Sequence, residues 1–173
     1  MKLTDELTIR VEEIFRTITK YLIEHHCTVT CMESCTSGFL ASLLTDTEGA
    51  SEIFPGSFVA YSNPAKIRFL VPAEVIDTYG VYSGETASAM AHAARDAMHT
   101  DYAFGITGTF GNVDPANADS VPGVIWYSVL LKDEEIVNNI VLPIGLSRRH
   151  YKYLAAEAVG RAFLESDEIG GKR

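Results

Sequence analysis

The sequence predicts an α/β fold of three layers, α/β/α, in which helices cover both faces of a mixed, mostly parallel sheet of about five strands. Short apolar segments typical of strands alternate with helical segments along the chain. The first three strands are separated by stretches long enough for helical crossovers, whereas the last two are joined by the short charged turn 132–135, which predicts a hairpin. At 173 residues and without an internal repeat, the chain fits one domain, 1–173.

Composition and charge exclude several classes of protein. Hydrophobic residues make up 47% of the chain and charged residues 21%, which is typical of a soluble globular domain rather than a disordered segment. The net charge of −9 and the lack of a basic stripe argue against a nucleic-acid partner. The longest apolar stretches are too short to cross a membrane and no signal-like segment opens the chain, so we expect a cytoplasmic protein with no membrane partner.

The three cysteines, Cys27, Cys31 and Cys35, are too few and too close together to form a disulfide framework. We interpret them as reduced and mostly buried thiols. They have no partnering histidine pair, so we expect no zinc site.

Hydrophobic periodicity and end signals place the elements in order. The expected helices are 4–26, about 39–46, a short one starting at 63, 72–79, 85–99 and 148–165, and the expected strands are the first half of 28–38, 56–62, 101–108, 123–131 and 136–143. Asn63 is expected to cap its helix, with Pro64 at the first helical position. Residues 167–173 are expected to be a frayed tail.

The stretch 28–38 is the first candidate for an active site. Its first half reads as a buried strand, and its second half is a run of small hydroxyl residues and glycine that leads into a helix. The first amides of a helix lack partners within the helix and attract anions. Ser34 lies at this turn, where its hydroxyl would face a ligand, although a simple helix-capping serine is the alternative.

Lys66 is the candidate base. The helix start at Asn63 and Pro64 places it inside the first turn, where the helix dipole disfavours a positive charge. No acidic residue lies between Glu52 and Glu74 to offset this effect locally. We therefore expect a lowered pKa for Lys66, and an exposed helix lysine is the alternative.

Three strand ends are expected to meet at one edge of the sheet, at Ser34, at 61–66 and at 107–109. Ligand sites of open α/β sheets gather at the carboxyl ends of the strands. The polar loop 109–122 follows the third of these ends, and a structureless loop of this length is usually functional or disordered.

Four motifs in order carry a resemblance to a known family: Glu33-Ser34-Cys35-Thr36-Ser37-Gly38, Gly49-Ala50-Ser51, Gly56 followed by Tyr61-Ser62-Asn63-Pro64-Ala65-Lys66, and Gly105-Ile106-Thr107-Gly108. They resemble the CinA C-terminal domain family, which includes the PncC-type nicotinamide mononucleotide deamidases, over roughly residues 5–165. The resemblance, to the stand-alone form of the domain, implies a compact α/β/α domain that commonly self-associates as a dimer or larger homo-oligomer. It also implies a small-molecule nucleotide substrate, nicotinamide mononucleotide, whose carboxamide is hydrolysed to the acid plus ammonia.

Carried over residue by residue, the resemblance implies a set of site residues. The catalytic residues would be Ser34, Lys66, Tyr61 and Thr107, and the substrate-binding residues Cys35, Thr36, Ser37, Gly38, Gly108, Thr109 and Arg148. Ser34 would attack the carboxamide, neutral Lys66 would take its proton, and backbone amides at 35–37 would hold the oxyanion. Tyr61 and Thr107 would orient the lysine or the substrate, and Arg148 would pair with the phosphate. We expect no metal and no other cofactor.

Some assignments have alternatives. Tyr61 and Thr107 are equally explained as ordinary strand residues, Cys35 is an alternative nucleophile, and Glu33 reads more readily as a solvated strand end than as a group that supports the site.

The chain departs from the family pattern in three places. Ser37 stands where the family usually has a glycine, Leu146 and Ser147 replace a Gly-Asp pair, and the segment 109–113 replaces a glycine-rich sequence after Gly108. Two alternative functions follow from these departures. One is a nucleotide- or partner-binding module without catalysis, and the other is a hydrolase of a different small amide.

Overall fold

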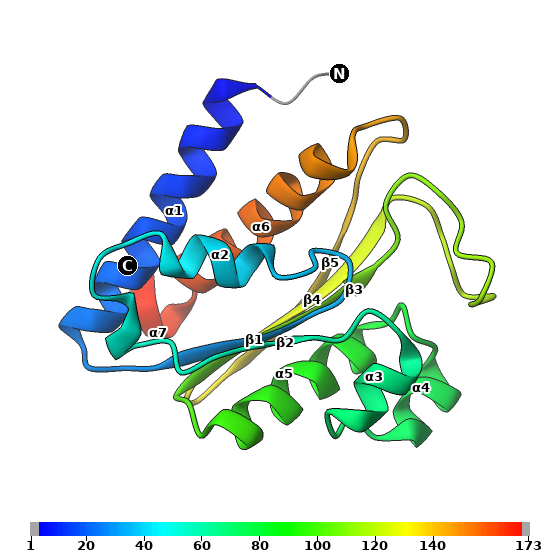
Figure 1. Cartoon of the computed structure of the whole chain (residues 1–173), viewed down its shortest axis with the longest axis horizontal. Helices are drawn as coiled ribbons and strands as arrows, with labels where there is room; N and C mark the ends of the chain where they lie inside the picture. The colour runs from blue at the N-terminus through cyan, green and yellow to red at the C-terminus, as the bar shows by residue number, and fades with distance from the viewer. Residues whose placement is uncertain (1–3, 171–173) are drawn as a thin grey trace.

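The structure, a computed structural model, describes residues 4–170. A five-stranded sheet lies between two layers of helices (Figure 1). The elements in chain order are α1 (Asp5–Glu24), β1 (Val29–Glu33), α2 (Phe39–Thr45), the 3-10 helix η1 (Ala50–Glu52), β2 (Phe58–Val59), α3 (Asn63–Arg68), α4 (Ala73–Tyr79), α5 (Gly84–Met98), β3 (Tyr102–Gly108), β4 (Val124–Leu130), β5 (Glu135–Val141), α6 (Arg148–Leu164) and α7 (Asp167–Gly170). Within the described residues, no helix has the length and apolar character needed to cross a membrane.

The sheet has the strand order β2-β1-β3-β4-β5. β1 pairs in parallel with both β2 and β3, whereas β4 is antiparallel to both of its neighbours. Four of the strands therefore run in one direction, which confirms the expected mixed, mostly parallel sheet. Every residue of β1 and β3 is buried, because these central strands are covered by helices on both faces.

The two largest of the three hydrophobic clusters among the described residues hold the layers together. The larger one packs α1, α2 and α6 on one face of the sheet, and the smaller one packs α3, α4 and α5 on the other. α5 approaches β3 closely because its facing residues are alanines and the strand has a glycine there. A Cβ built on Gly105 would lie 2.0 Å from the carbonyl oxygen of Ala87, so no larger residue fits without moving the helix.

The second strand is shorter than expected. β2 has two residues instead of the predicted 56–62, because β1, the strand with which it pairs, turns away after Glu33 and leaves the later residues without a ladder partner. The predicted cap of the following helix was also wrong by one residue. Ser62 is the N-cap of α3, and its Oγ accepts a hydrogen bond of 3.3 Å from the amide of Ala65.

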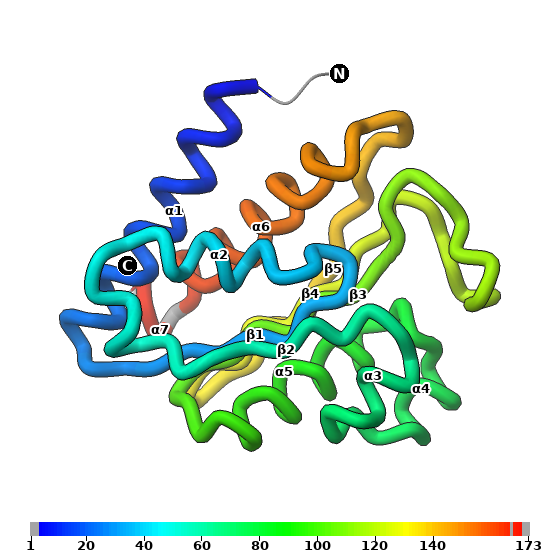
Figure 2. Tube along the Cα trace, in the orientation of Figure 1, coloured from blue at the N-terminus to red at the C-terminus, as the bar shows by residue number. Residues whose placement is uncertain are grey.

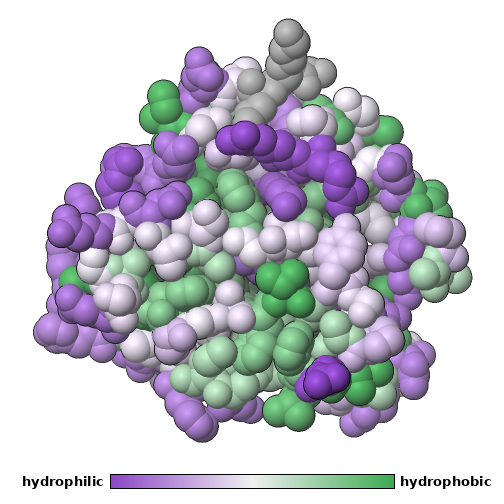
Figure 3. Space-filling view, in the orientation of Figure 1, coloured by the Kyte–Doolittle hydropathy of each residue, from purple (hydrophilic) through white to green (hydrophobic). Residues whose placement is uncertain are grey.

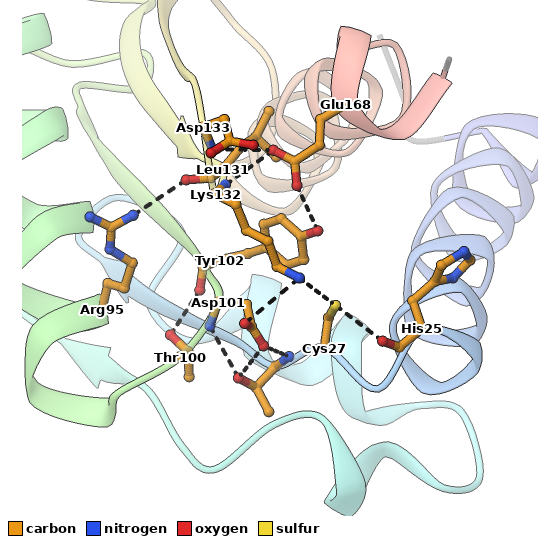
Figure 4. A network of polar contacts seen from close by, with 11 residues as sticks. His25, Cys27, Arg95, Thr100, Asp101, Tyr102, Leu131, Lys132, Asp133 and Glu168 are labelled. Carbon is orange, nitrogen blue, oxygen red and sulfur yellow. Dashed lines mark hydrogen bonds and ion pairs between the residues drawn. The ribbon is translucent and has the colours of Figure 1, made fainter.

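The expected frayed tail was wrong for residues 167–170, which form the short helix α7. Glu168 on this helix accepts a 2.8 Å hydrogen bond from the buried Tyr102 hydroxyl and a 3.1 Å hydrogen bond from the amide of Lys132 (Figure 4). A buried phenol needs an acceptor, and this need fixes the helix. The rest of the expected tail, 171–173, lies outside the described residues.

The β2 edge of the molecule carries exposed apolar side chains. Figure 2 shows the β3–β4 connection reaching out past the end of β3 on the side where α3 and α4 lie. On the face seen in Figure 3, apolar residues gather over β2 and α3, where Val59, Ile67 and Leu70 are exposed. Hydrophilic residues line the left margin and form a band across the upper part of this face, above the apolar region.

Gly105→Ala should lower the free energy of unfolding by about 3 kcal/mol, because overpacking of a tight interface forces the backbone apart. Gly145→Ala is the control: its φ is +90° but nothing lies within 4 Å of the new Cβ, so only backbone strain of about 1 kcal/mol is expected. Urea unfolding of both variants measures the two losses. Equal losses would show that α5 and β3 are not closely packed.

Candidate active site

A buried serine and a buried lysine form the centre of the candidate site. Ser34 lies in the turn after β1, and Lys66 lies on α3, 32 residues further along the chain. The Nζ atom of Lys66 is 3.1 Å from the Oγ atom of Ser34 and 3.0 Å from the carbonyl oxygen of Ala60. The exposed fraction is 5% for Ser34 and 1% for Lys66, so both side chains are shielded from bulk water.

Burial lowers the pKa of Lys66 to about 8. The negative charges that Cys35 and Asp114 can carry oppose this shift. The direction agrees with the expectation from the sequence, but the physical cause is desolvation rather than the helix dipole. The alternative of an exposed helix lysine is wrong, because the side chain folds back from α3 beneath the turn that carries Ser34.

Glu33 has no exposed surface and caps α2 with its side chain. Its carboxylate accepts hydrogen bonds from the amides of Gly38 at 3.0 Å, Leu40 at 3.1 Å and Ala41 at 2.9 Å. The expectation of a solvated strand end was therefore wrong. The amides that were expected to attract a ligand anion already hold this carboxylate. The sequence did contain a signal for this role of Glu33. The N-cap of α2 is Gly38, which has no side chain to cap the helix, and Glu33 is the acidic residue that precedes it.

The amides of residues 35–37, the expected oxyanion donors, differ in the acceptors they already have. The amide of Ser37 donates to the carbonyl oxygen of Ser34 at 3.1 Å, and Ser37 adopts a left-handed φ of +55°. Within residues 4–170, no oxygen acceptor is bonded to the amides of Cys35 and Thr36. Of the three expected oxyanion donors, the amide of Ser37 is therefore already used within the turn. The amides of Cys35 and Thr36 are directed at the Cys35 thiol.

Cys35 lines the cavity but is poorly suited to act as a nucleophile. Burial, together with the charge of Glu33, raises the pKa of its thiol to about 12, so the thiol stays protonated near neutral pH. All three cysteines are free and buried, as expected from the sequence. The chemistry therefore favours Ser34 over Cys35.

A cavity of about 480 Å³ opens in front of Ser34 and Lys66. Its walls come from the turn after β1, from the segment 61–66, from the β3–β4 loop and from the start of α6. Of the expected binding residues, the cavity is lined by Cys35, Gly108, Thr109 and Arg148. It is not lined by Thr36, Ser37 and Gly38, which lie in the turn behind it.

Tyr61 and Arg148 lie together at the exposed side of the cavity. Arg148 donates a 2.9 Å hydrogen bond from Nη2 to the hydroxyl of Tyr61, and its guanidinium lies 5.2 Å from the ring centroid of Phe110. Tyr61 therefore contacts Arg148, and no hydrogen bond joins it to Lys66 or Ser34 among the described residues. The pair leaves a cationic group at the mouth of the cavity.

Thr107 is buried and does not line the cavity. Its hydroxyl donates a 2.9 Å hydrogen bond to the carbonyl oxygen of Val81, a residue that does line it. The expectation that Thr107 orients Lys66 or the substrate directly is not met in this structure. Its hydroxyl instead donates to the backbone of Val81 and so stabilises that part of the cavity wall.

Sequence reasoning missed three polar residues of the cavity wall, Tyr82, Asp114 and Asn117. The Asp114 carboxylate accepts hydrogen bonds from the Tyr82 hydroxyl, from Asn117 Nδ2 at 2.6 Å and from the amide of Ala116 at 2.9 Å. Asn117 in turn accepts a 2.9 Å hydrogen bond from Asn63 on α3. The only signal in the sequence was the richness of the loop in Asn and Asp, which form local turns.

Known proteins similar to this chain carry CinA names. The profile described as "CinA C-terminal domain" matches residues 11–163. A competence-damage inducible protein of Lysinibacillus sphaericus is 38% identical over 116 residues, which are 66% of this chain and 27% of that protein. One of Moorella thermoacetica is 46% identical over 91 residues, 52% of this chain and 22% of that protein. The chain thus spans about a quarter of the length of these curated relatives.

Solved structures share the fold. A CinA superfamily protein from Escherichia coli superposes with a TM-score of 0.81 at 25% identity, covering 95% of this chain and 94% of the other. A competence damage-inducible protein A from Klebsiella pneumoniae has a TM-score of 0.83 at 19% identity, covering 94% of this chain and 99% of the other. These matches confirm the predicted α/β fold. The profile match over residues 11–163 shows that the chain belongs to the CinA C-terminal domain family.

Proposed function

We propose that this chain is an amidohydrolase that converts nicotinamide mononucleotide to nicotinic acid mononucleotide and ammonia. The observation that carries the proposal is the 3.1 Å contact between Lys66 Nζ and Ser34 Oγ inside a cavity of about 480 Å³. A volume of this size suits a mononucleotide. A nucleophile within hydrogen-bond reach of a group that can take its proton is the arrangement that covalent amide hydrolysis requires.

Acylation begins with Lys66 in its neutral form. Its Nζ takes the proton of Ser34 as Oγ attacks the carboxamide carbon, and the backbone amide of Cys35, a residue that lines the cavity, is the candidate donor to the oxyanion. When the tetrahedral intermediate collapses, the C–N bond breaks and Lys66 returns the proton to the leaving nitrogen, which departs as ammonia. The product of this half-reaction is an ester of Ser34.

Deacylation repeats the same steps with water. Lys66 takes a proton from the water that attacks the ester, and then returns it to Ser34 as the acid leaves. Arg148 at the cavity mouth is suited to the substrate phosphate because a guanidinium binds phosphate oxygens in a bidentate manner. The buried site also limits access of bulk water before the amide is bound.

The rewritten β3–β4 loop favours one alternative in particular, a hydrolase of a different small amide, because its residues Phe110–Asn117 form one wall of the cavity. Retention of Ser34 and Lys66 in hydrogen-bond contact argues against a binding module that has lost catalysis. Saturable binding of the nucleotide by the wild-type protein without ammonia release would instead favour the binding module.

Ser34→Ala should reduce ammonia release from nicotinamide mononucleotide by roughly a thousandfold or more, because the covalent step is lost. The control is Ser42→Ala, which alters an exposed serine on α2 and should leave the rate unchanged. The assay is ammonia release by each purified protein. Full activity in the Ser34 variant would exclude it as the nucleophile.

Lys66→Met should abolish turnover and stabilise the fold. The pKa of Lys66 is about 8 in the folded protein and about 10.5 in the unfolded chain, so the unfolded state binds the proton more tightly. Below pH 8 both states are charged, and the buried charge destabilises the fold by on the order of 3 kcal/mol. This cost is relieved as pH rises from about 8 to about 10.5. The gain from methionine should therefore be largest below pH 8 and shrink towards pH 10.5.

Urea unfolding of the Lys66 variant at pH 7 and pH 10 measures this gain, with the exposed Lys20→Met on α1 as the control. A gain that does not depend on pH would contradict the buried-charge explanation.

The pH profile provides an independent check on the base. If neutral Lys66 is required, kcat/KM should rise about tenfold per pH unit below the pKa of about 8 and level off above it. Steady-state rates of the wild type between pH 6 and pH 10 test this prediction. A profile that is flat across pH 8, or falls there, would exclude Lys66 as the base.

A further inference from the structure

The β3–β4 loop places a fixed carboxylate on the cavity wall. Asp114 lines the same cavity as Ser34 and Lys66. Three donors hold its carboxylate, the Tyr82 hydroxyl and Asn117 Nδ2 on Oδ2 and the amide of Ala116 on Oδ1. They come from two different parts of the chain, so the carboxylate is held in position before a ligand arrives.

The negative charge of Asp114 has no ion-pair partner in the free protein. Between residues 4 and 170, no lysine, arginine or histidine nitrogen lies within 4.0 Å of its carboxylate oxygens. The three hydrogen bonds, the one from Tyr82 most of all, lower its pKa, so the carboxylate stays ionised at neutral pH. All three donors are uncharged. The positive charge of Lys66 also lowers the pKa of Asp114, so the Asp114 charge is free to interact with a ligand when Lys66 is neutral.

The other charged groups of the cavity show what ligand would complement it. Lys66 and Arg148 are the cations of the lining, and Asp114 is its carboxylate. Lys66 must be neutral to act as the base, and Arg148 lies at the mouth, hydrogen-bonded to Tyr61. In the reactive state the cavity therefore holds a cation at its mouth and an anion on the loop wall. A ligand with an anionic end and a cationic end matches this arrangement.

We propose that Asp114 selects substrates that carry a positive charge near the scissile carboxamide, such as an N-substituted pyridinium ring, over substrates with a neutral ring. The inference rests on the proposed function, since it concerns the same cavity. A pyridinium carboxamide with a phosphate has the charge pattern just described, the ring cation towards Asp114 and the phosphate towards Arg148. Asp114 is thus a specificity residue and takes no part in bond breaking.

A purely structural role for Asp114 is the competing explanation. The loop has other anchors, because Thr109 Oγ1 donates to the carbonyl oxygen of Val121 at 2.6 Å and Asp119 accepts from the amide of Tyr82 at 2.8 Å. Asp114→Asn keeps an oxygen acceptor and the same shape while removing the charge. Its amide nitrogen replaces one of the two accepting oxygens, so at least one of the three hydrogen bonds is lost. The effect of the charge is therefore measured by the difference between two ligands that differ in charge, because a lost loop hydrogen bond weakens the binding of both.

The experiment measures equilibrium binding of two ligands that differ in ring charge, nicotinamide mononucleotide and its reduced 1,4-dihydro form. Ser34→Ala protein is used so that no turnover occurs, at pH 9, where Lys66 is mostly neutral. The pyridinium form should bind more tightly than the reduced form. Adding Asp114→Asn should weaken binding of the pyridinium form by about tenfold and change binding of the reduced form by roughly twofold or less.

The matched control is Asp119→Asn, which removes a charge from the same loop at a residue outside the cavity lining and should leave the preference intact. Equal weakening of both ligands by Asp114→Asn would overturn the proposal and assign Asp114 to the loop structure or to the ribose hydroxyls. If that variant does not fold, the Ser34→Ala protein alone decides, because the absence of a preference for the pyridinium form also overturns the proposal. Neither result depends on ammonia release, so failure of this inference is distinguishable from failure of the proposed function.

Discussion

The buried carboxylate of Glu33 is the constraint on which the site depends. A charge with no exposed surface is tolerated only where donors surround it, and the amides of Gly38, Leu40 and Ala41 supply them. These bonds fix where α2 begins relative to the end of β1 and therefore fix the turn that contains Ser34. The same charge helps to keep the neighbouring Cys35 thiol protonated. One carboxylate thus positions the serine and raises the pKa of the thiol next to it.

Burial has a different consequence for Lys66, whose pKa it lowers. Glu33 has three amide donors for its buried carboxyl group, whereas desolvation favours the neutral form of Lys66. The two residues lie on different segments, and the sheet joins them: β1 carries Glu33 and Ser34 to its carboxyl end, and the chain leaving β2 enters α3 at the same edge. The fold therefore brings a hydrogen-bonded carboxyl group and a lysine with a lowered pKa to the same edge of the sheet.

The local parts of this arrangement were predictable from the sequence, and the tertiary parts were not. The strand–turn–helix around Ser34 follows from periodicity, and the Asn-Pro signal placed the start of α3 to within one residue, so Ser34 and Lys66 could both be identified as candidates. The role of Glu33 was missed because it requires knowing how the turn folds back over the strand. Thr107 was assigned to the lysine or the substrate because its position matched a motif, and a motif does not specify where a hydroxyl points. The Asn- and Asp-rich loop indicated local turns around Asp114, but it could not place Asp114 in the cavity, because this placement involves Tyr82, 32 residues away.

The β3–β4 loop differs from the other cavity walls in how it is attached to the fold. Both of its ends belong to one antiparallel pair, closed at the base by Gly108 opposite Ile125, so the loop is a hairpin insertion rather than a crossover. The free-energy cost of closing such a loop grows slowly with its length, and the strand register beneath it does not depend on its sequence. The whole loop sequence can therefore be replaced by another without moving Ser34 or Lys66. A chain built in this way can acquire a new ligand preference by replacing one contiguous segment, while the chemistry stays on the parallel half of the sheet.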